Sequence, residues 1–248
     1  MSAAIKIEHL VKSYPGSEKP VVNGLNLTIN EGEIFGLLGP NGAGKTTTIS
    51  ILTGMRKANS GKITIDGKNP ETDFEAIKQV IGVVPQDIAL YETLTARENL
   101  TFFGVMYGLK GKQLRDRVNS LLEIFGLEKV GNRLVRFYSG GMKRRVNLIA
   151  GILHNPKILF LDEPTVGIDV QSRNAIIEYL QELNKHGMTI VYTSHHLKEA
   201  QHFCSQVTII DSGLPIISGK PSELIGSQPE YHNLEAIFLK LTGYRIRD

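Results

Sequence analysis

Short apolar stretches recur along the chain, and their spacing predicts most of its strands. Residues 5–10 and 25–29 alternate apolar with polar side chains, which is typical of strands that bury one face. Residues 34–38 and 158–161 are continuous apolar runs, as expected of strands buried on both faces. Shorter runs predict further strands at 62–67 (with a turn), 80–84, 189–192, 207–211 and 215–218.

Apolar residues spaced three and four apart predict helices between these strands. The candidates are residues 47–52, 142–153, 170–186, 196–203 and 233–241. Because strands and helices alternate, we expect an α/β fold with a mostly parallel sheet covered by helices on both faces. The region before residue 67 is largely β, and there we expect an N-terminal antiparallel β subdomain.

A purely helical stretch interrupts this alternation between about residues 87 and 137. Leu100 and Phe103 lie on one apolar helix face, and Leu114, Val118 and Leu121 lie on another. We therefore expect a single domain over residues 1–248, with a helical subdomain inserted at 87–137 and a helical tail at 220–248.

A glycine-rich segment directly follows the apolar run at 34–38. It fits the pattern Gly-x-x-x-x-Gly-Lys-Ser/Thr, and a predicted helix comes after it. A phosphate chain needs many donors at short range, and glycines let backbone N–H groups approach it closely. This context predicts a P-loop NTPase core whose nucleotide-binding residues are Gly39, Pro40, Asn41, Gly42, Ala43, Gly44, Lys45, Thr46 and Thr47.

Charged and hydroxyl groups in two segments complete the chemistry of ATP hydrolysis. Lys45 supplies a positive charge for the β- and γ-phosphates, at the positive end of the predicted helix. Thr46 and Asp162 offer oxygen ligands to Mg²⁺. Glu163, at the exit of a buried strand beside Asp162, can polarise an attacking water. Together they indicate hydrolysis of Mg-ATP.

Ser139, Gly140 and Gly141 stand at the head of the predicted helix 142–153. A helix N-terminus binds anions, so this segment is a candidate for a second phosphate site. An ordinary serine N-cap explains the same residues equally well when they are taken in isolation.

With these motifs in place, the chain resembles the nucleotide-binding subunit of an ABC transporter over nearly its whole length. The segment from Tyr138 to Met142 resembles the signature motif of that family, which is usually Leu-Ser-Gly-Gly-Gln. The resemblance implies that Ser139, Gly140 and Gly141 act on the nucleotide of a second subunit, which is another copy of the chain or a paralogous one.

The same resemblance implies roles for four more residues. Gln86 would touch Mg²⁺ and sense a transmembrane partner, and His195 would contact the γ-phosphate. Asp169 matches a loop that crosses the dimer interface. Tyr14 would stack on adenine, although simple loop packing also explains a tyrosine there. His196 follows His195 directly, and we expect it to be a solvated residue of the first helical turn.

Departures from the family pattern indicate which branch of the family the chain resembles. Tyr138 replaces Leu and Met142 replaces Gln, and the run Lys143-Arg144-Arg145 follows. This segment is similar to exporters of drugs, lipids or polysaccharides, and residues 92–100 and 234–243 also look like that branch. A basic run is compatible with nucleic-acid binding, but here we expect one exposed helix face beside a nucleotide site.

Composition and charge exclude several classes of protein. Hydrophobic residues make up 41% and charged residues 21% of the chain, which is typical of a globular domain. The net charge of +3 is too small to indicate binding to nucleic acid or to an anionic membrane. Cys204 is the single cysteine, which excludes an internal disulfide and is typical of a reducing compartment. We recognise no secretory signal and no bilayer-spanning run of apolar residues.

These observations predict an ATPase that drives a separate transmembrane permease through ATP-dependent dimer closure, with ATP and Mg²⁺ as its ligands. We expect it to be cytoplasmic and peripheral on the inner face of the cell membrane, held there by the permease, without direct contact to nucleic acid. One alternative is a soluble ABC-type ATPase acting on ribosomes or nucleic acid, which usually carries tandem cassettes or a coiled-coil insertion. The other is a nucleotide-gated binding module without turnover, against which Glu163 and His195 argue.

Overall fold

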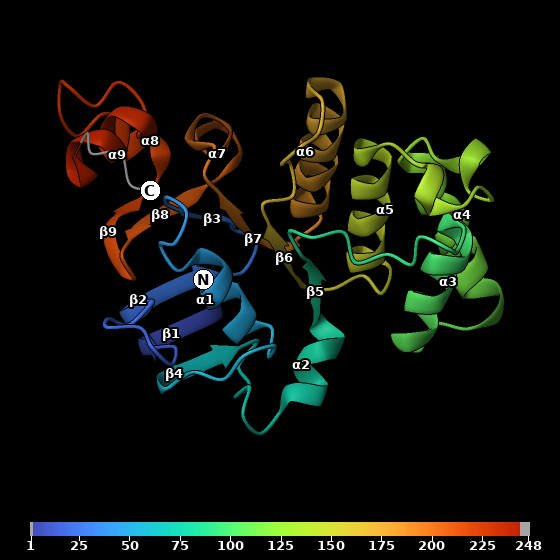
Figure 1. Ribbon diagram of the computed structural model, residues 1–248, viewed down its shortest axis with the longest axis horizontal. Helices are drawn as coiled ribbons and strands as arrows, with labels where there is room; N and C mark the ends of the chain where they lie inside the picture. The colour runs from blue at the N-terminus through green and yellow to red at the C-terminus, as the bar shows by residue number, and fades with distance from the viewer. Residues whose placement is uncertain (1, 244–248) are drawn as a thin grey trace.

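The computed structural model describes residues 2–243, and the strands in that range form two sheets (Figure 1). The larger sheet has six strands in the order β5-β6-β7-β3-β8-β9. All neighbouring pairs are parallel except β8 with β9, which are antiparallel. The strands are β3 (Ile34–Leu38), β5 (Ile81–Val84), β6 (Ile158–Asp162), β7 (Thr189–Ser194), β8 (Gln206–Asp211) and β9 (Leu214–Gly219).

A smaller antiparallel sheet comes from the first part of the chain. It has three strands in the order β2-β1-β4, with β1 (Ala3–Lys12) pairing with both β2 (Val22–Asn30) and β4 (Ser60–Ile65). Alternating side chains explain the arrangement, because Ile5, Leu25 and Ile65 point into one shared core. The expected N-terminal antiparallel β region is therefore confirmed.

Alternation within the buried strands separates two hydrophobic cores on opposite faces of the large sheet. In β6, Ile158 and Phe160 belong to the core shared with the antiparallel sheet, whereas Leu159 and Leu161 belong to the other. Helices α1 (Lys45–Leu52) and α2 (Phe74–Val80) cover the first face together with the small sheet. The second face is covered by α5 (Gly140–Ile152), α6 (Val170–Lys185) and α7 (Leu197–Phe203).

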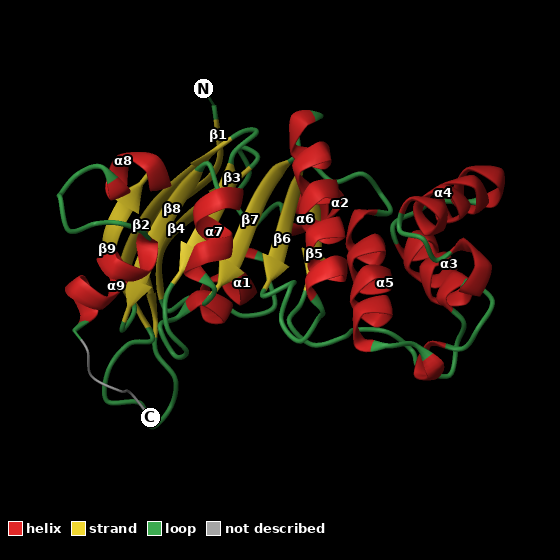
Figure 2. Ribbon diagram, turned by 90° about the horizontal axis from the view of Figure 1, so that it is seen from above, coloured by secondary structure: helices red, strands yellow, loops and turns green. Residues whose placement is uncertain are grey.

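The segment between β5 and α5 carries only helices and loops. It contains α3 (Ala96–Met106), α4 (Gly111–Ile124) and two short 3-10 turns, η1 (Glu128–Val130) and η2 (Val135–Phe137). Figure 2 shows α3 and α4 beyond α5, away from both sheets. At the other end of the molecule, α8 (Pro221–Ile225) and α9 (Leu234–Thr242) pack beside α7. The last part of the expected tail, residues 244–248, lies outside the described residues.

Two local expectations were wrong. Val80 ends helix α2 instead of opening a strand, because pairing of Ile81 with Ile158 sets where β5 begins. Helix α2 itself is absent from the sequence-based expectation, since its seven residues are too short to show a clear helical period. Helices lie on both faces of the large sheet, as expected, and the small sheet covers one of these faces as well. Among the described helices, none has the length and apolar character needed to cross a membrane.

Candidate functional site

The candidate site lies where three parallel strands end side by side. Strands β6, β7 and β3 are neighbours in that order, with Asp162 opposite Thr193 and Leu38 opposite Ser194. Because parallel strands present their carboxyl ends at one edge, the segments after them meet there. The glycine-rich loop follows β3, Glu163 follows β6, and His195 follows β7.

The loop between β3 and α1 requires glycine at two positions. Gly39 has φ +154°, and a Cβ there would lie 2.3 Å from the carbonyl oxygen of Ile210. Gly44 has φ +103°, and its Cβ would lie 2.6 Å from the carbonyl oxygen of Val21. The loop is therefore folded tightly against the ends of neighbouring strands, in a form that only glycine allows.

Helix α1 begins directly after this loop with its first turn free of a side-chain cap. Its N-cap is Gly44, which has no side chain to accept the first N–H groups. The helix dipole adds partial positive charge at the same end. The sequence thus leaves a helix N-terminus that can bind an anion.

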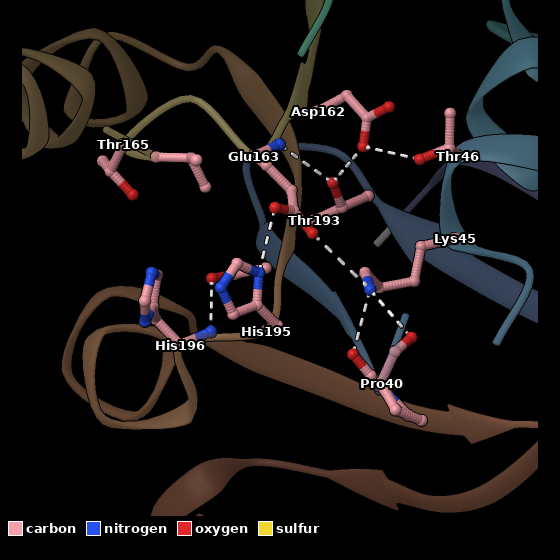
Figure 3. Close-up of polar contacts among 12 residues, drawn as sticks. Pro40, Lys45, Thr46, Asp162, Glu163, Thr165, Thr193, His195 and His196 are labelled. Carbon is pink, nitrogen blue, oxygen red and sulfur yellow. Dashed lines mark hydrogen bonds and ion pairs between the residues drawn. The ribbon is translucent and has the colours of Figure 1, made fainter. Parts of the chain in front are cut away.

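Lys45 is buried within the loop and points across it (Figure 3). Its Nζ donates to the carbonyl oxygens of Gly39 at 2.9 Å and Pro40 at 3.1 Å, and lies 3.6 Å from Oε1 of Glu163. Burial lowers the pKa of Lys45, and the charge of Glu163 opposes that effect. The ammonium group therefore stands between the loop and the carboxylate at the end of β6.

Asp162 and Thr46 bring two oxygens together beside the loop. The Thr46 hydroxyl donates to Oδ1 of Asp162 at 3.3 Å, and the buried Thr193 hydroxyl donates to the same oxygen at 2.5 Å. A carboxylate and a hydroxyl are hard oxygen donors of the kind Mg²⁺ prefers, and Mg²⁺ commonly takes its other ligands from water and phosphate. The donor set thus fits Mg²⁺.

Glu163 is buried and has two partners at this edge (Figure 3). Its Oε1 faces Lys45, and its Oε2 lies 2.9 Å from Nδ1 of His195, a partly exposed side chain. Its backbone has φ +48°, an unusual value for a non-glycine residue that costs on the order of 1 kcal/mol. The Glu163 N–H donates to the Thr193 hydroxyl at 3.1 Å, which holds this conformation.

His196 takes no part in the contact with Glu163. Its backbone N–H donates to the Ser194 hydroxyl at 2.8 Å, and its ring packs at a tilt on the ring of His195. The side chain is exposed, as expected. The geometry therefore distinguishes the two consecutive histidines.

Tyr14 lies next to the phosphate loop. Its hydroxyl is 3.4 Å from Oγ1 of Thr47, and its ring has the cations of Lys12 and Arg56 at 5.4 and 5.3 Å from its centroid. A half-buried aromatic ring beside the loop can stack on a flat base.

Gln86 lies just beyond β5 with its side chain exposed. Its contact with the rest of the protein is through the backbone, where its carbonyl oxygen accepts a hydrogen bond from Arg144 at 2.6 Å. No contact found among residues 2–243 joins its side chain to Thr46 or Asp162. The role that the resemblance implies for Gln86 is therefore not visible in a single chain.

The serine-glycine segment heads α5, on a different side of the sheet from α1 (Figures 1 and 2). The Ser139 hydroxyl accepts the N–H of Met142 at 3.2 Å as an N-cap. A Cβ on Gly141 would lie 3.0 Å from Oγ of Ser172. Asp169 caps α6 by accepting the N–H of Ser172 at 2.9 Å, a contact that lowers the pKa of its carboxyl.

Two side chains that hold this site together, Thr193 and Glu199, were not singled out from the sequence. The Thr193 hydroxyl joins Asp162 to the backbone of Glu163. In the sequence, its only mark is that it is a polar residue near the end of an apolar strand. Glu199 accepts from the hydroxyls of Thr165 and Tyr192, connecting α7 to the segment after Glu163. Nothing in the spacing of these residues along the chain predicts their contact.

The basic run after the serine-glycine segment does not form one exposed face, contrary to expectation. Lys143 is paired with Glu92, and Arg145 donates to the carbonyl oxygen of Phe125 at 2.7 Å. Arg144 is only 7% exposed. The reason is that a helix turns each residue by about 100°, so three consecutive side chains meet different neighbours.

Comparison with known proteins gives a family match over this region. A family model described as ABC transporter matches residues 22–166. The chain is 46% identical over 220 residues to the linearmycin resistance ATP-binding protein LnrL of Bacillus subtilis, covering 89% of this chain and 70% of that protein. It is 42% identical to the Nod factor export ATP-binding protein I of Paraburkholderia xenovorans, covering 91% of this chain and 74% of that protein.

Solved structures give the same result. A structure titled as the ATP binding subunit of an ABC transporter superposes with a TM-score of 0.87 at 28% identity, covering 97% of this chain and all of the other. A dimeric structure of the ATP-binding cassette MJ0796 with ADP and Pi superposes with a TM-score of 0.80 at 28% identity. That alignment covers 87% of this chain and 98% of the cassette.

Proposed function

The chain belongs to the ABC transporter family, and we propose that it is the ATP-hydrolysing subunit that drives a separate membrane permease of the exporter type. Proteins of this family bind ATP and couple its hydrolysis to transport. The observation that carries the proposal is the meeting of Lys45, Asp162 and Glu163 at one edge of the sheet. A phosphate cradle, a metal ligand and a buried carboxylate are the groups that phosphoryl transfer to water requires.

The loop and α1 bind and orient the triphosphate in this proposal. Backbone N–H groups of the loop and the first turn of α1 donate to the phosphate oxygens. Lys45, held by the Gly39 and Pro40 carbonyls, directs its charge at the β- and γ-phosphates. Thr46 and Asp162 would hold Mg²⁺, which would neutralise charge on the phosphates.

Glu163 and His195 act on the water and the γ-phosphate. Glu163 accepts a proton from the attacking water at its carboxylate, which the left-handed backbone directs away from the strand. His195, 2.9 Å from that carboxylate, fixes its orientation and contacts the γ-phosphate. Gln86 would complete the environment of the attacking water and of the metal ion.

A second copy or a paralogous subunit completes each site. Ser139, Gly140 and Gly141 form a helix N-terminus that lies apart from the phosphate loop of its own chain, and it serves the nucleotide of the partner. Asp169 lies at that interface, and Tyr14 stacks on adenine within its own chain. The dimeric structure of the MJ0796 cassette supports the formation of a dimer.

The relatives support export over the alternative of an ATPase that acts on ribosomes or nucleic acid. One of the similar proteins is named for Nod factor export. The protein would lie at the inner face of the membrane through its permease, and we propose that residues 87–137 form the subdomain that contacts it.

Helix α3 offers a surface for that contact. Phe102, Val105 and Met106 lie three and four residues apart on one exposed face, with Tyr91 packed edge-on against Phe102. We call these four residues the α3 patch. Val105 is 54% and Met106 68% exposed, which is unusual for apolar side chains and typical of an interaction site. Glu98 is a poor probe of the same surface, because it closes the capping box of α3 with Thr95.

Introducing a charge on the α3 patch is expected to uncouple transport from hydrolysis. Met106→Lys should reduce the permease recovered with the protein from detergent by about tenfold, as loss of an apolar anchor does. Basal ATPase should survive, since α3 lies away from the phosphate loop. Leu214→Lys, at an exposed apolar residue on β9, is the matched control. Equal recovery with Met106→Lys and wild type would exclude α3 as the docking surface.

A further inference from the structure

Arg144 is a buried cation without a carboxylate partner at ion-pair distance among the described residues. It is 7% exposed and lies one turn into α5, the helix headed by the serine-glycine segment, which we call the signature helix. Burial lowers its pKa, and the charges of Asp87 and Glu163 oppose that effect. A buried guanidinium is costly unless its N–H groups are satisfied, so its hydrogen bonds determine what it does here.

Those hydrogen bonds go to backbone carbonyls of two separate loops. Nη1 donates to Pro85 at 3.3 Å and to Gln86 at 2.6 Å. Nη2 donates to Val166 at 3.5 Å, in the segment between Glu163 and Asp169. One side chain of the signature helix therefore contacts both the loop of Gln86 and the loop that leads to the dimer interface.

Asn147 lies one turn further along α5 and holds the first of these loops. Its Nδ2 donates to the carbonyl oxygen of Pro85 at 3.4 Å, and its Oδ1 accepts the N–H of Ala89 at 3.2 Å. Asn147 is 3% exposed, so its amide is committed to these contacts. Arg144 and Asn147 share one helix face, and both donate to the carbonyl oxygen of Pro85, while Asn147 also accepts from Ala89 at the other end of residues 85–89.

We propose that Arg144 and Asn147 are positioning residues that tie the Gln86 loop to the signature helix, and that Arg144 extends this tie to the loop at Val166. The contacts of Arg144 and Asn147 are independent of the proposed function, whereas their effect on ATP hydrolysis rests on it. Moving the Gln86 loop alone would leave Nη1 of a buried guanidinium without its two acceptors, the carbonyl oxygens of Pro85 and Gln86, which is costly. The two loops and the helix therefore move as one unit, so a displacement of residues 85–89 by the permease is transmitted to the signature and to the dimer interface.

Arg144→Lys tests this positioning role, because lysine keeps the positive charge but lacks the planar guanidinium that reaches both loops. In nucleotide-free protein, Arg144→Lys should accelerate amide hydrogen exchange in residues 85–89 and 164–168 by about tenfold or more, as expected when hydrogen bonds to a charged group are lost. Asn147→Ala should accelerate exchange in 85–89 only, since Asn147 has no hydrogen bond to Val166. Amides of β1 and β2 serve as the internal reference for global stability.

Arg145→Lys is the matched control, because Arg145 donates to Gly141 and Phe125 and to neither loop. Amide hydrogen exchange in both loops of Arg145→Lys should equal that of the wild-type protein. The inference is overturned if Arg144→Lys leaves exchange in 85–89 unchanged, or if Arg145→Lys raises it equally. It is also overturned if Asn147→Ala accelerates 164–168 as much as 85–89.

Kinetics separate positioning from a general loss of structure. Arg144→Lys should leave the Kd for ATP within about twofold of wild type and lower kcat by about tenfold, because misplacement of a catalytic group costs rate more than binding. A rise in Kd equal to the fall in kcat would contradict positioning. If the wild-type protein hydrolyses no ATP while hydrogen exchange in the variants changes as expected, the proposed function is wrong, but the positioning role of Arg144 and Asn147 is still supported.

Discussion

Lys45→Ala is expected to reduce ATP turnover by at least about a hundredfold, the loss typical when one preorganised charge-stabilising group is removed from a transition state. ATP affinity should also fall, since the β- and γ-phosphates lose their nearest cation. Replacing Lys45 should also disturb the loop itself, because its Nζ donates to the Gly39 and Pro40 carbonyl oxygens there. Phosphate release by purified protein and a binding titration measure the two effects.

Lys62→Ala is the control, since Lys62 is an exposed lysine on β4. It should leave turnover and affinity at the wild-type level. A thermal melt of Lys45→Ala establishes that the fold survives. Near-normal ATPase in folded Lys45→Ala would contradict the assignment of the loop as the phosphate site.

Glu163→Gln is expected to separate binding from chemistry. The amide keeps the shape of the carboxylate but cannot take a proton from water, so kcat should fall by about a hundredfold to ten-thousandfold. ATP should remain bound, because Glu163 contacts Lys45 and His195 and not the loop glycines. Single-turnover hydrolysis of bound ATP gives the rate of the chemical step.

The consecutive histidines provide a matched pair for the same site. His195→Ala should lower turnover, because it removes the group 2.9 Å from the Glu163 carboxylate. His196→Ala should leave turnover near wild type. The reverse pattern would mean that the wrong histidine was chosen, and wild-type turnover in Glu163→Gln would show that another group activates the water.

The site could be predicted from sequence where its chemistry is local. The phosphate loop is contiguous from Gly39 to Thr47, and its backbone conformation follows from its own glycines. Asp162 and Glu163 follow a buried strand directly, so the parallel arrangement alone places them at the edge with the loop. Local patterns also predict the order of strands and helices, because each buried face repeats every two or about 3.6 residues.

Contacts between distant segments could not be predicted in the same way. Thr193 holds Asp162 and Glu163 across thirty residues or more of chain, which no local pattern encodes. Arg144 was expected on an exposed face because neighbouring charges usually mark solvent, yet the loops at Gln86 and Val166 cover it. The start of β5 was misplaced because Val80 continues an apolar run whose boundary depends on pairing with β6.

ATP should join two chains through the segment from Ser139 to Gly141, and the mass of the protein in solution reports whether it does. On the Glu163→Gln background, saturating Mg-ATP should convert monomer to dimer. Adding Ser139→Arg should prevent the conversion, because it replaces the N-cap of α5 with a bulky side chain at the proposed interface. Light scattering with size-exclusion chromatography reports both states. A protein that stays monomeric with saturating Mg-ATP, or that dimerises equally well with Ser139→Arg, would contradict ATP-dependent dimer closure through Ser139.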